Sequence, residues 1–532
     1  MQVCDLEPQA TTKQCLPCDA RRNILALFAV CLAAMMFGLE ISSVPAILPT
    51  LEGVLHADFK QMQWIMNAYT IACTTVLMAT GTLADRFGRK RMFIVSIVLF
   101  GIASLWCGLA SSAPVLIASR FLQGASGGAM LICLVAVLSH QFPQGAERAR
   151  AFSAWGIILG IGLGFGPLIG SAIVALSSWQ WVFWVHVLIS IVTLVLAVPG
   201  VRESRDPHAS KLDVAGMVTL SGAVFGFVSF ITQGADIGFT SRSGIAIFVA
   251  STASLVAFFV AEMRSAHPMF DFSVFRIRNF SGALLGSVGM NFSFWPFIIY
   301  LPIYFQHALG ASPMVAGLFL LAYTLPTLVF PPIGERLALR YSPAIVIPAG
   351  LFTIGLGFFL MRVGSAFDHT SALAILPGCF VAGAGLGITN TPVTNTTTGS
   401  ASGTRAGMAS GIDMSARMIT LAINIAMMGL LLVKGVAHRL QDALPAAPLD
   451  ISWDAMANRI AIGDLHPAAA AQWPALSSDG FAAISRGALV HGFEWLMLYG
   501  GIAVCTLAVV SYLIFSGGKV THVKRETIAD PR

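Results

Sequence analysis

The chain has 532 residues, of which 56% are hydrophobic and only 11% are charged, with a formal net charge of +6. A soluble domain carries about a quarter charged residues, so this composition excludes a water-soluble globular protein and indicates an integral membrane protein. The positive charge does not indicate a nucleic-acid partner, because the bases gather in short connections between apolar segments.

Apolar segments of about 20 residues, each long enough to cross about 30 Å of hydrocarbon as a helix, recur along the chain. Backbone polar groups in hydrocarbon must be satisfied within their own segment, so these segments are predicted to be helices. Fourteen are predicted, at 24–46, 63–83, 92–111, 114–137, 151–173, 181–200, 214–233, 244–263, 280–303, 312–333, 343–361, 371–391, 408–433 and 493–515. The predicted fold class is therefore all-α and integral to the membrane.

The N-terminal segment before residue 24 is polar, and the apolar segment after it is longer than the core of a signal peptide. We therefore expect the first helix to remain in the mature protein. Cys15 and Cys18 in this segment have no second ligand pair, so neither a metal site nor a cofactor is predicted. If the chain starts in the cytoplasm, the connections on that side carry most of the Lys and Arg, as the positive-inside rule requires. Both termini are thus predicted to be cytoplasmic.

Glu40 in the first predicted helix and Arg120 in the fourth are charged residues within apolar segments. Each charge costs roughly 2.5 to 3.5 kcal/mol near a helix centre, so such residues are usually functional. Counting at 1.5 Å per residue places both about 9 Å below the outer surface, where they could pair. A proton arriving at Glu40 would then release Arg120. The alternative is a purely structural ion pair.

The connection after the second predicted helix, GTLADRFGRKR at 81–91, holds an unusual concentration of charge. Its glycines permit a tight turn and close helix approach, and its acid could bond the neighbouring arginines or face the N-terminus of the helix 408–433. We interpret the segment as a cytoplasmic gate that holds two halves of the protein together; the alternative is a solvated turn that only sets topology. The gate residues are Gly81, Asp85, Arg86, Gly88 and Arg89.

A partial internal repeat supports two halves. Ala-Tyr-Thr at 68–70 recurs at 322–324, and Leu-Ala at 83–84 recurs at 337–338. Paired halves of this kind are used for alternating access in transporters. The predicted domains are an N-terminal six-helix bundle at 1–200, two inserted helices at 201–265, and a C-terminal six-helix bundle at 266–532 with an outer loop at 434–490.

The fifth predicted helix carries several glycines one turn apart and a proline. Small residues at this spacing bring helix backbones together, and proline allows a kink. We interpret Gly162, Gly166, Pro167 and Gly170 as a hinge and seal between the halves, with ordinary tight packing as the alternative.

The ninth predicted helix is rich in aromatic residues, which stack on flat cations. Phe294, Trp295, Tyr300 and Tyr304 are predicted to line a substrate cavity, unless they face lipid. His186 in the sixth helix is interpreted as a packed polar residue. In the thirteenth, Asp413 and Arg417 have the spacing of a helical ion pair, and Asp413 is a further candidate for proton coupling.

These motifs resemble those of the major facilitator superfamily: the segment 81–91 is similar to its loop signature, 120–124 to its buried-arginine motif, and 160–170 to its antiporter motif. With fourteen predicted helices the chain resembles the 14-helix drug:proton antiporters. The resemblance implies a major facilitator fold of two six-helix bundles plus two inserted linker helices. It also implies export of lipophilic, often cationic, toxic compounds in exchange for protons.

No GxxxxGK[ST] phosphate-binding loop occurs, so an ion gradient is the expected energy source. A channel would need a continuous polar pore, and an enzyme would need clustered ligands, so a transporter is predicted rather than an enzyme. Two alternatives stay open: an exporter of one metabolite, and an uptake symporter. The predicted location is a bacterial inner membrane, with small-molecule substrates, protons and lipid as partners and no nucleic acid. The segment 434–490 could be a lid or a dock for a periplasmic adaptor protein.

Overall fold

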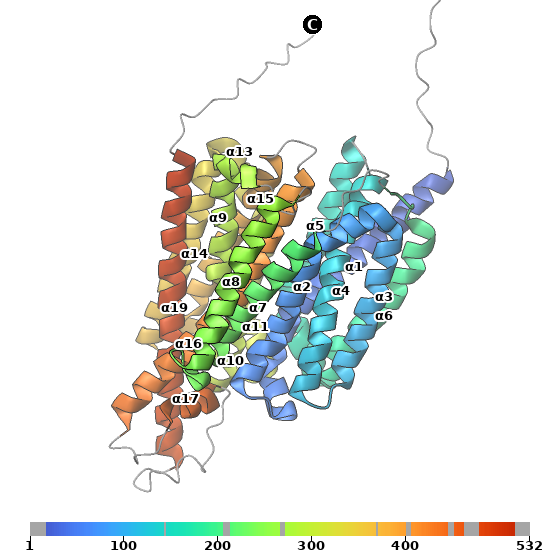
Figure 1. Cartoon of the computed structure of the whole chain (residues 1–532). Coiled ribbons are helices and arrows are strands. Elements are labelled where there is room, and N and C mark those ends of the chain that lie inside the picture. The colour runs from blue at the N-terminus through green and yellow to red at the C-terminus, as the bar shows by residue number, and fades with distance from the viewer. Residues whose placement is uncertain are drawn as a thin grey trace, which may run out of the picture.

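The computed structural model describes residues 17–142, 145–205, 213–265, 272–368, 371–400, 406–444, 452–461 and 478–516, and these residues contain helices and no strand. The helices run side by side as a bundle (Figure 1). The first eight are α1 (Pro17–Leu55), α2 (Phe59–Phe87), α3 (Arg89–Leu109), α4 (Ala113–Gln141), α5 (Gly145–Leu176), α6 (Gln180–Gly200), α7 (Val214–Ile237) and α8 (Arg242–Arg264).

The second part of the chain contains more broken helices. A short turn η1 (Phe272–Arg276) is followed by α9 (Arg278–Phe292), α10 (Phe294–Ile303), the π-helical turn η2 (Tyr304–Ala308), α11 (Pro313–Thr324), α12 (Pro326–Val329), α13 (Pro331–Tyr341) and α14 (Pro343–Phe367). Then come the turn η3 (Ala372–Ala374), α15 (Leu376–Gly399), α16 (Ala406–Ala443), α17 (Trp453–Ala461) and α19 (Ser478–Ser516).

The all-helical membrane fold is confirmed. Among the described residues, eleven helical spans are long and apolar enough to cross a membrane. A twelfth forms if α11–α12 and α13, which are bent by 42° relative to each other, are one span. Each of the fourteen predicted segments falls on helical structure, but α2 and α15 are not among these twelve, so the number fourteen stays a prediction.

Two sets of helices pack around separate centres. In the N-terminal half, α1 packs on α5 and α6, and α4 packs on α2 and α3. In the C-terminal half, α14 packs on α15 and α19, and α19 also contacts α9 and α16. Helix α7 lies against α2 of one half and α16 of the other, and α8 lies against α7 (Figure 1). The exact division at residues 200 and 265 stays a prediction.

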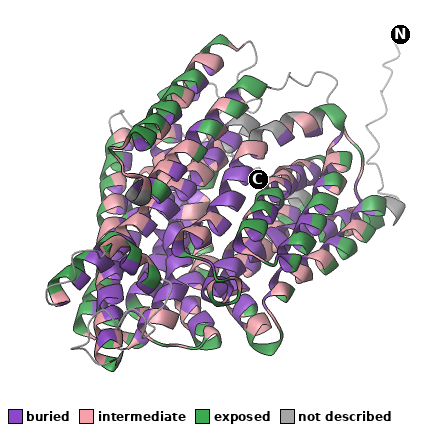
Figure 2. Ribbon diagram, turned by 60° about the horizontal axis from the view of Figure 1, so that its bottom comes forward, coloured by how far each residue is buried: buried purple, intermediate pink, exposed green. Residues whose placement is uncertain are grey.

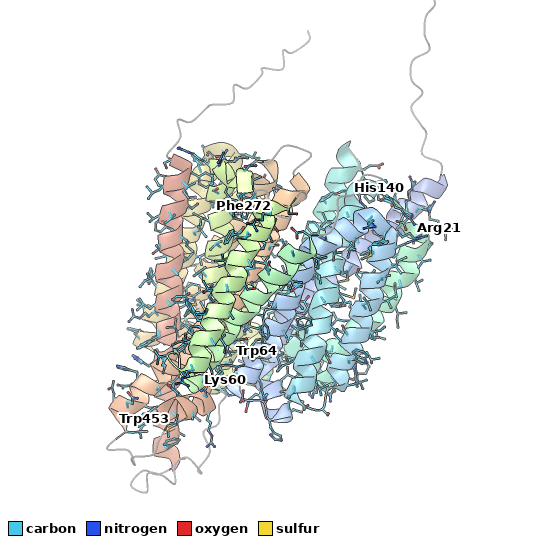
Figure 3. The ribbon with its side chains drawn as sticks, in the orientation of Figure 1. Arg21, Lys60, Trp64, His140, Phe272 and Trp453 are labelled. Carbon is cyan, nitrogen blue, oxygen red and sulfur yellow. The ribbon has the colours of Figure 1, made fainter. Side chains whose placement is uncertain are left out.

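The bundle has two ends, which we name by the chain. The terminal face is the end where α1 begins and α19 ends, and Figure 3 shows Arg21, His140 and Phe272 there. The far face is the opposite end, with Lys60 and Trp453.

The apolar cores differ between these ends. One core joins both halves, and all its members from the N-terminal half lie near the far face, in residues 44–66, 107–116 and 179–183. The rest of the N-terminal half has its own core toward the terminal face, with partly buried Met414 and Met418 of α16 packed against it. Figure 2 shows the buried residues in the interior and the exposed ones on the outward faces. The largest apolar contact between the halves therefore lies near the far face, and a further core joins Ile71 of α2 to α7, α9 and α16.

Gly156, Gly160 and Gly164 lie on one face of α5, and the atoms nearest to them show where this face borders the C-terminal half. A Cβ atom at Gly164 would lie 3.8 Å from the Thr324 carbonyl oxygen, and one at Gly160 would lie 2.9 Å from Leu328. A Cβ at Gly156, one turn nearer the terminal face, would meet no atom within 4 Å among the described residues. On this face of α5, the glycines at 160 and 164 therefore border the C-terminal half, and Gly156 borders none of the described residues.

Three predicted boundaries were wrong. Helix α1 continues past Pro45 and Pro49 to Leu55 instead of ending at residue 46, because a proline in a membrane helix is tolerated where neighbouring helices support the backbone. The predicted span 280–303 is one span that continues to Ala308, with its α-helical pattern interrupted at Ser293 between α9 and α10. The predicted outer loop 434–490 is largely helical where it is described, as the end of α16, α17 and the start of α19.

Candidate functional site

The N-terminal half encloses a fully buried group of charged and polar side chains. Glu40 on α1, Arg120 on α4 and His186 on α6 are each at most 1% exposed. They meet because α1 packs on both α4 and α6. Burial of three ionisable groups in apolar surroundings is costly unless they pair, so this group is the first candidate for function.

Arg120 is held by partners from several helices. Its Nη1 donates to Glu40 Oε1 in a short ion pair and to Gln123 Oε1 at 2.7 Å. Its Nε donates to the Ile65 carbonyl oxygen at 3.2 Å, and its guanidinium lies 4.4 Å from the centre of the Tyr69 ring. Gln123 in turn donates to Ser104 at 2.9 Å. The arginine is therefore fixed in one position by ionic, polar and aromatic contacts.

The contact between Glu40 and Arg120 was predicted and is present, although α1 continues beyond the predicted end of its helix. Because α1 extends to Leu55, fifteen residues follow Glu40 in its helix, which is about 22 Å. Arg120 lies seven residues from the start of α4 at Ala113, which is about 10 Å. The two side chains meet because the last turns of α1 extend beyond the start of α4.

His186 was interpreted from the sequence only as a packed polar residue. It is packed, with its ring against the edge of Phe100, but it also faces the ion pair. Its Nε2 lies 3.5 Å from Glu40 Oε2, and its Nδ1 lies 3.0 Å from the Val182 carbonyl oxygen. The sequence signal available was the rarity of an ionisable residue inside a membrane helix.

A second buried ion pair lies in the C-terminal half. Arg417 Nε donates to Asp413 Oδ2 at 3.1 Å, as the spacing predicted, and Ser287 on α9 donates a short hydrogen bond to Asp413. The rest of the guanidinium donates to α15, to Asn390 Oδ1 at 2.6 Å and to Thr394 Oγ1 at 3.0 Å. Sequence reasoning missed Ser287, Asn390 and Thr394, because polar residues spread over α9 and α15 have no distinctive spacing.

The glycine and proline residues of α5 face two different neighbours. Cβ atoms at Gly162, Gly166 and Gly170 would strike α1, and Ser42 on α1 donates to the Gly162 carbonyl oxygen at 3.0 Å. These three therefore close a seam within the N-terminal half, whereas the predicted seal was between the halves. The opposite face makes that seal: Thr324 donates to the Gly164 carbonyl oxygen at 2.6 Å.

The C-terminal half also touches α5 at Pro167. A Cβ at Gly317 on α11 would lie 3.2 Å from the Pro167 carbonyl oxygen. Of the four hinge candidates, Pro167 is thus the one whose backbone borders the other half.

The predicted gate forms the turn between α2 and α3. Gly88 has φ 112°, a left-handed conformation that favours glycine, and a Cβ there would lie 2.5 Å from Glu203 Oε1. This carboxylate oxygen accepts hydrogen bonds from Lys90 N at 3.1 Å and Ser204 N at 3.0 Å. Arg89 N donates to the Ser204 carbonyl oxygen at 3.0 Å. The turn thus packs on the segment after α6, and the Glu203 carboxylate accepts a hydrogen bond from a backbone N–H in the first turn of α3, which has no partner within its own helix.

The other gate residues are placed as follows. Gly81 lies in α2, with Ile132 on α4 at 3.9 Å from where its Cβ would be. Arg86 is exposed, and its guanidinium lies 5.6 Å from the centre of the Phe87 ring. The side chains of Asp85 and of Cys15 and Cys18 lie outside the described part of the chain.

The aromatic residues predicted to line a cavity are largely enclosed within the bundle. Phe294 stacks on Tyr323 with ring centres 4.0 Å apart. The Tyr300 hydroxyl donates to the Ile425 carbonyl oxygen, and the Tyr304 hydroxyl lies 3.3 Å from Ser365 Oγ. Trp295 is partly buried. In this conformation the tyrosine hydroxyls bond to protein groups, and a role toward substrate stays a prediction.

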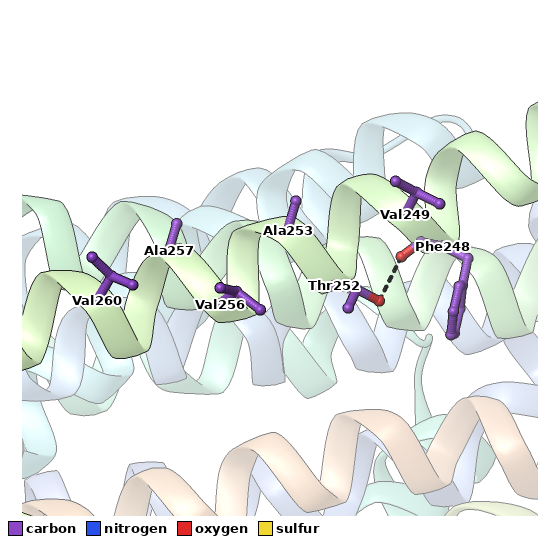
Figure 4. Close-up of a pocket in the computed structure, with 7 residues that line it drawn as sticks. All are labelled: Phe248, Val249, Thr252, Ala253, Val256, Ala257 and Val260. Carbon is purple, nitrogen blue, oxygen red and sulfur yellow. Dashed lines mark hydrogen bonds between the residues drawn. The ribbon is translucent and has the colours of Figure 1, made fainter.

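A surface hollow of about 550 Å³ lies on α8 and has no part in either ionic group (Figure 4). It is almost entirely apolar, as expected for a helix that faces lipid. Its lining residues are Phe248, Val249, Thr252, Ala253, Val256, Ala257 and Val260.

Comparison with known proteins identifies the class. Residues 29–425 match the profile of the Major Facilitator Superfamily. The chain is 30% identical over 430 residues to the multidrug resistance protein Stp of Mycobacterium tuberculosis (strain CDC 1551 / Oshkosh), covering 81% of this chain and 80% of that protein. It is 29% identical to the tetracenomycin C resistance and export protein of Streptomyces glaucescens, covering 79% and 77%.

Solved structures agree with this fold. A POT family transporter in complex with a thioalcohol-conjugated peptide aligns with a TM-score of 0.60 at 14% identity, covering 91% of this chain and 94% of that one. A bacterial homologue of the human lysosomal transporter Spinster, in an inward-facing and unoccupied conformation, aligns with a TM-score of 0.59 at 14% identity, covering 95% and 98%. The family match and the relatives identify a multi-pass membrane transporter rather than an enzyme. The chain belongs to the Major Facilitator Superfamily.

Proposed function

We propose that this transporter exports lipophilic, often cationic, toxic compounds in exchange for protons by alternating access. Export is supported by the names of its relatives, which are resistance and efflux proteins. Proton exchange rests on one observation, the fully buried ion pair of Glu40 and Arg120 beside His186. A carboxylate in this position can change its charge without any other ligand.

We place the protein in a bacterial inner membrane with both termini in the cytoplasm. The bases of the terminal face support this orientation, since Arg21, Arg22 and the turn 86–91 lie at that end. With this orientation, a conformation open toward the terminal face is the one that receives compounds from the cytoplasm.

Proton binding and release would act through helix α1. When Glu40 is ionised, it holds Arg120, and α1 is tied to α4. A proton on the carboxylate weakens this attraction, while Gln123 and the Ile65 carbonyl oxygen continue to hold the guanidinium. Because α1 also bonds to α5 through Ser42, and α5 borders the C-terminal half, a shift of α1 reaches the surface between the halves.

The C-terminal ion pair supplies a second candidate for the same coupling. Asp413 is 3% exposed, and both of its oxygens are engaged, by Ser287 and by Arg417. We propose that substrate lies between this pair and the N-terminal group, against Phe294, Trp295, Tyr300 and Tyr304 when those residues separate during the cycle.

The proton gradient supplies enough free energy for export. A proton crossing 100 mV gains about 2.3 kcal/mol, and each unit of pH difference adds about 1.4 kcal/mol. One proton exchanged for each uncharged molecule therefore supports an outward concentration ratio of roughly 100-fold or more. Export of a monovalent cation against the same potential cancels the electrical gain, so each unit of pH difference then supports a ratio of about 10-fold.

The outer segment is proposed to cover the far face. Helix α17 buries Met456 and Ile460 in the shared core, and its Asp454 pairs with Lys434 of α16 at 2.7 Å. These contacts support a lid held by the chain itself rather than a free dock for an adaptor protein.

The test is transport of the fluorescent cation rhodamine 123 into proteoliposomes under an imposed pH gradient. The wild type should accumulate the dye, and Glu40→Gln should lose at least 10-fold of this accumulation, because the amide cannot exchange a proton. Glu147→Gln, which changes an exposed carboxylate at the start of α5, is the matched control and should behave as the wild type. Wild-type flux that ignores the gradient would refute antiport, and accumulation in the opposite direction would indicate symport.

A further inference from the structure

The hydrogen-bond pattern of His186 fixes where its hydrogen lies. Nδ1 is 3.0 Å from the Val182 carbonyl oxygen, and a carbonyl oxygen only accepts, so Nδ1 carries a hydrogen. In a neutral imidazole the other nitrogen, Nε2, then has a lone pair and no hydrogen. This nitrogen faces Glu40 Oε2 at 3.5 Å.

An ionised Glu40 also presents only lone pairs to this contact. Its Oε1 is taken by Arg120, whereas Oε2 and His186 Nε2 have no other hydrogen-bond partner among the described residues. Two buried acceptors facing each other without a hydrogen repel and are both unsatisfied. One proton on either atom converts this repulsion into a hydrogen bond or an ion pair, so the geometry requires a proton between them.

No neighbouring group among the described residues donates a hydrogen to this contact, and Arg120 Nη2, a buried donor without a partner, does not bond to Oε2. Helix α6 packs on α1, α3 and α5. Helix α1 contributes the charged group Glu40 itself, and α3 contributes the Cys107 thiol as the nearby titratable group. The membrane part of α5, residues 151–176, contains no titratable group. Beyond Glu40 lie Arg120 and the Tyr69 ring. The charges of Arg120 and ionised Glu40 cancel, so the group carries a net charge of one with the shared proton and none without it.

We propose that His186 Nε2 and Glu40 Oε2 together hold the proton that is exchanged in the transport cycle. This inference rests on the proposed antiport and adds His186 to it as a proton-binding residue. On release, the N–H or O–H bond breaks, the proton passes to water, and no other bond forms or breaks. The contact between α1 and α6 then changes from attraction to repulsion, while Arg120 stays bound to Oε1.

The experiment measures proton release and pH dependence together. Purified transporter in weakly buffered detergent solution is mixed with rhodamine 123, and released protons are followed with a pH indicator between pH 5 and pH 9. The variants are His186→Phe, which keeps a ring against Phe100, and His186→Gln, which keeps hydrogen bonding. The matched control is His307→Phe, which removes a partly buried histidine in η2 of the C-terminal half.

We expect wild type and the control to release protons on dye binding over the same pH range. In both His186 variants this pH range should change, because the Nε2 lone pair no longer takes part in holding the proton. On acidification, His186→Phe should also gain an infrared carboxylic-acid band that disappears in His186→Phe combined with Glu40→Gln.

An unchanged pH range in either variant would overturn the inference. So would a lower yield of folded protein whose remaining activity keeps the wild-type pH profile, since that is the result of a purely structural histidine. Failure of the proposed antiport is a different result: the wild type would bind the dye and release no proton.

Discussion

Replacing Gly88 by alanine should destabilise the turn between α2 and α3 through one identified collision. The new Cβ would lie 2.5 Å from Oε1 and 2.7 Å from Cδ of Glu203, so the carboxylate must move. It would then lose its hydrogen bonds from Lys90 N and Ser204 N. The left-handed backbone at φ 112° adds a further cost for any residue with a side chain.

The magnitude follows from these two terms. A left-handed residue costs roughly 1 to 2 kcal/mol. Each hydrogen bond to the carboxylate contributes about 1 kcal/mol, since the Glu203 side chain is 34% exposed and water competes for it. We expect Gly88→Ala to lower the free energy of unfolding by about 3 kcal/mol. Ser342 shows that the backbone strain alone is tolerated, because it adopts φ 89° at the equivalent turn before α14, where its own hydroxyl accepts from Ala344 N.

A double-mutant cycle isolates the collision. Glu203→Ala alone should cost about 2 kcal/mol, from the two lost hydrogen bonds. Adding Gly88→Ala to it should cost only the backbone strain, so the double variant should be about as stable as Gly88→Ala alone. The assay is unfolding in mixed detergent with increasing dodecyl sulfate, followed by tryptophan fluorescence. Strictly additive costs would refute the reasoning, because the carboxylate would then not be what the new methyl group displaces.

Two further predictions concern the α5 seam and the second ion pair. Gly170→Ala should lower the free energy of unfolding by about 1 to 3 kcal/mol, because its Cβ would lie 2.9 Å from Ser43. Gly156→Ala, whose Cβ would meet no described atom within 4 Å, should be neutral or slightly stabilising in the same assay. Equal effects of the two substitutions would contradict the faces assigned to these glycines. Asp413→Asn should sharply reduce the yield of monodisperse protein on gel filtration, because Arg417 loses its buried counter-charge. Combining Asp413→Asn with Arg417→Gln should restore this yield, because no unpaired charge is then buried. A double variant with no higher yield than Asp413→Asn would show that other groups also depend on this ion pair.

The helices could be predicted from the sequence because their length is set by the membrane. Their ends could not be predicted as well. The first helix was predicted to end at residue 46, yet α1 continues past Pro45 and Pro49 to Leu55. The proximity of Glu40 and Arg120 was correctly predicted, because an isolated buried charge has few possible partners.

The parts that the sequence did not predict depend on how each helix is rotated about its axis. The glycines of α5 have the spacing for close packing, but the spacing does not say that Gly162 and Gly170 face α1 while Gly164 faces the other half. His186 likewise required knowledge of the face that α6 turns toward α1. Glu203 lies beyond the end of α6, outside every predicted span, so no periodic pattern draws attention to it.

The closure at the far face has a thermodynamic consequence. The core shared by the two halves is apolar there, and the hydrogen bonds across it include neutral ones such as that from Gln306 to the Ala46 carbonyl oxygen at 3.3 Å. Opening that end exposes apolar side chains to water, whereas the last turns of α15 expose polar side chains such as Thr394 and Asn395. The two conformations should therefore differ in heat capacity, and cooling should favour the one that exposes the greater apolar area.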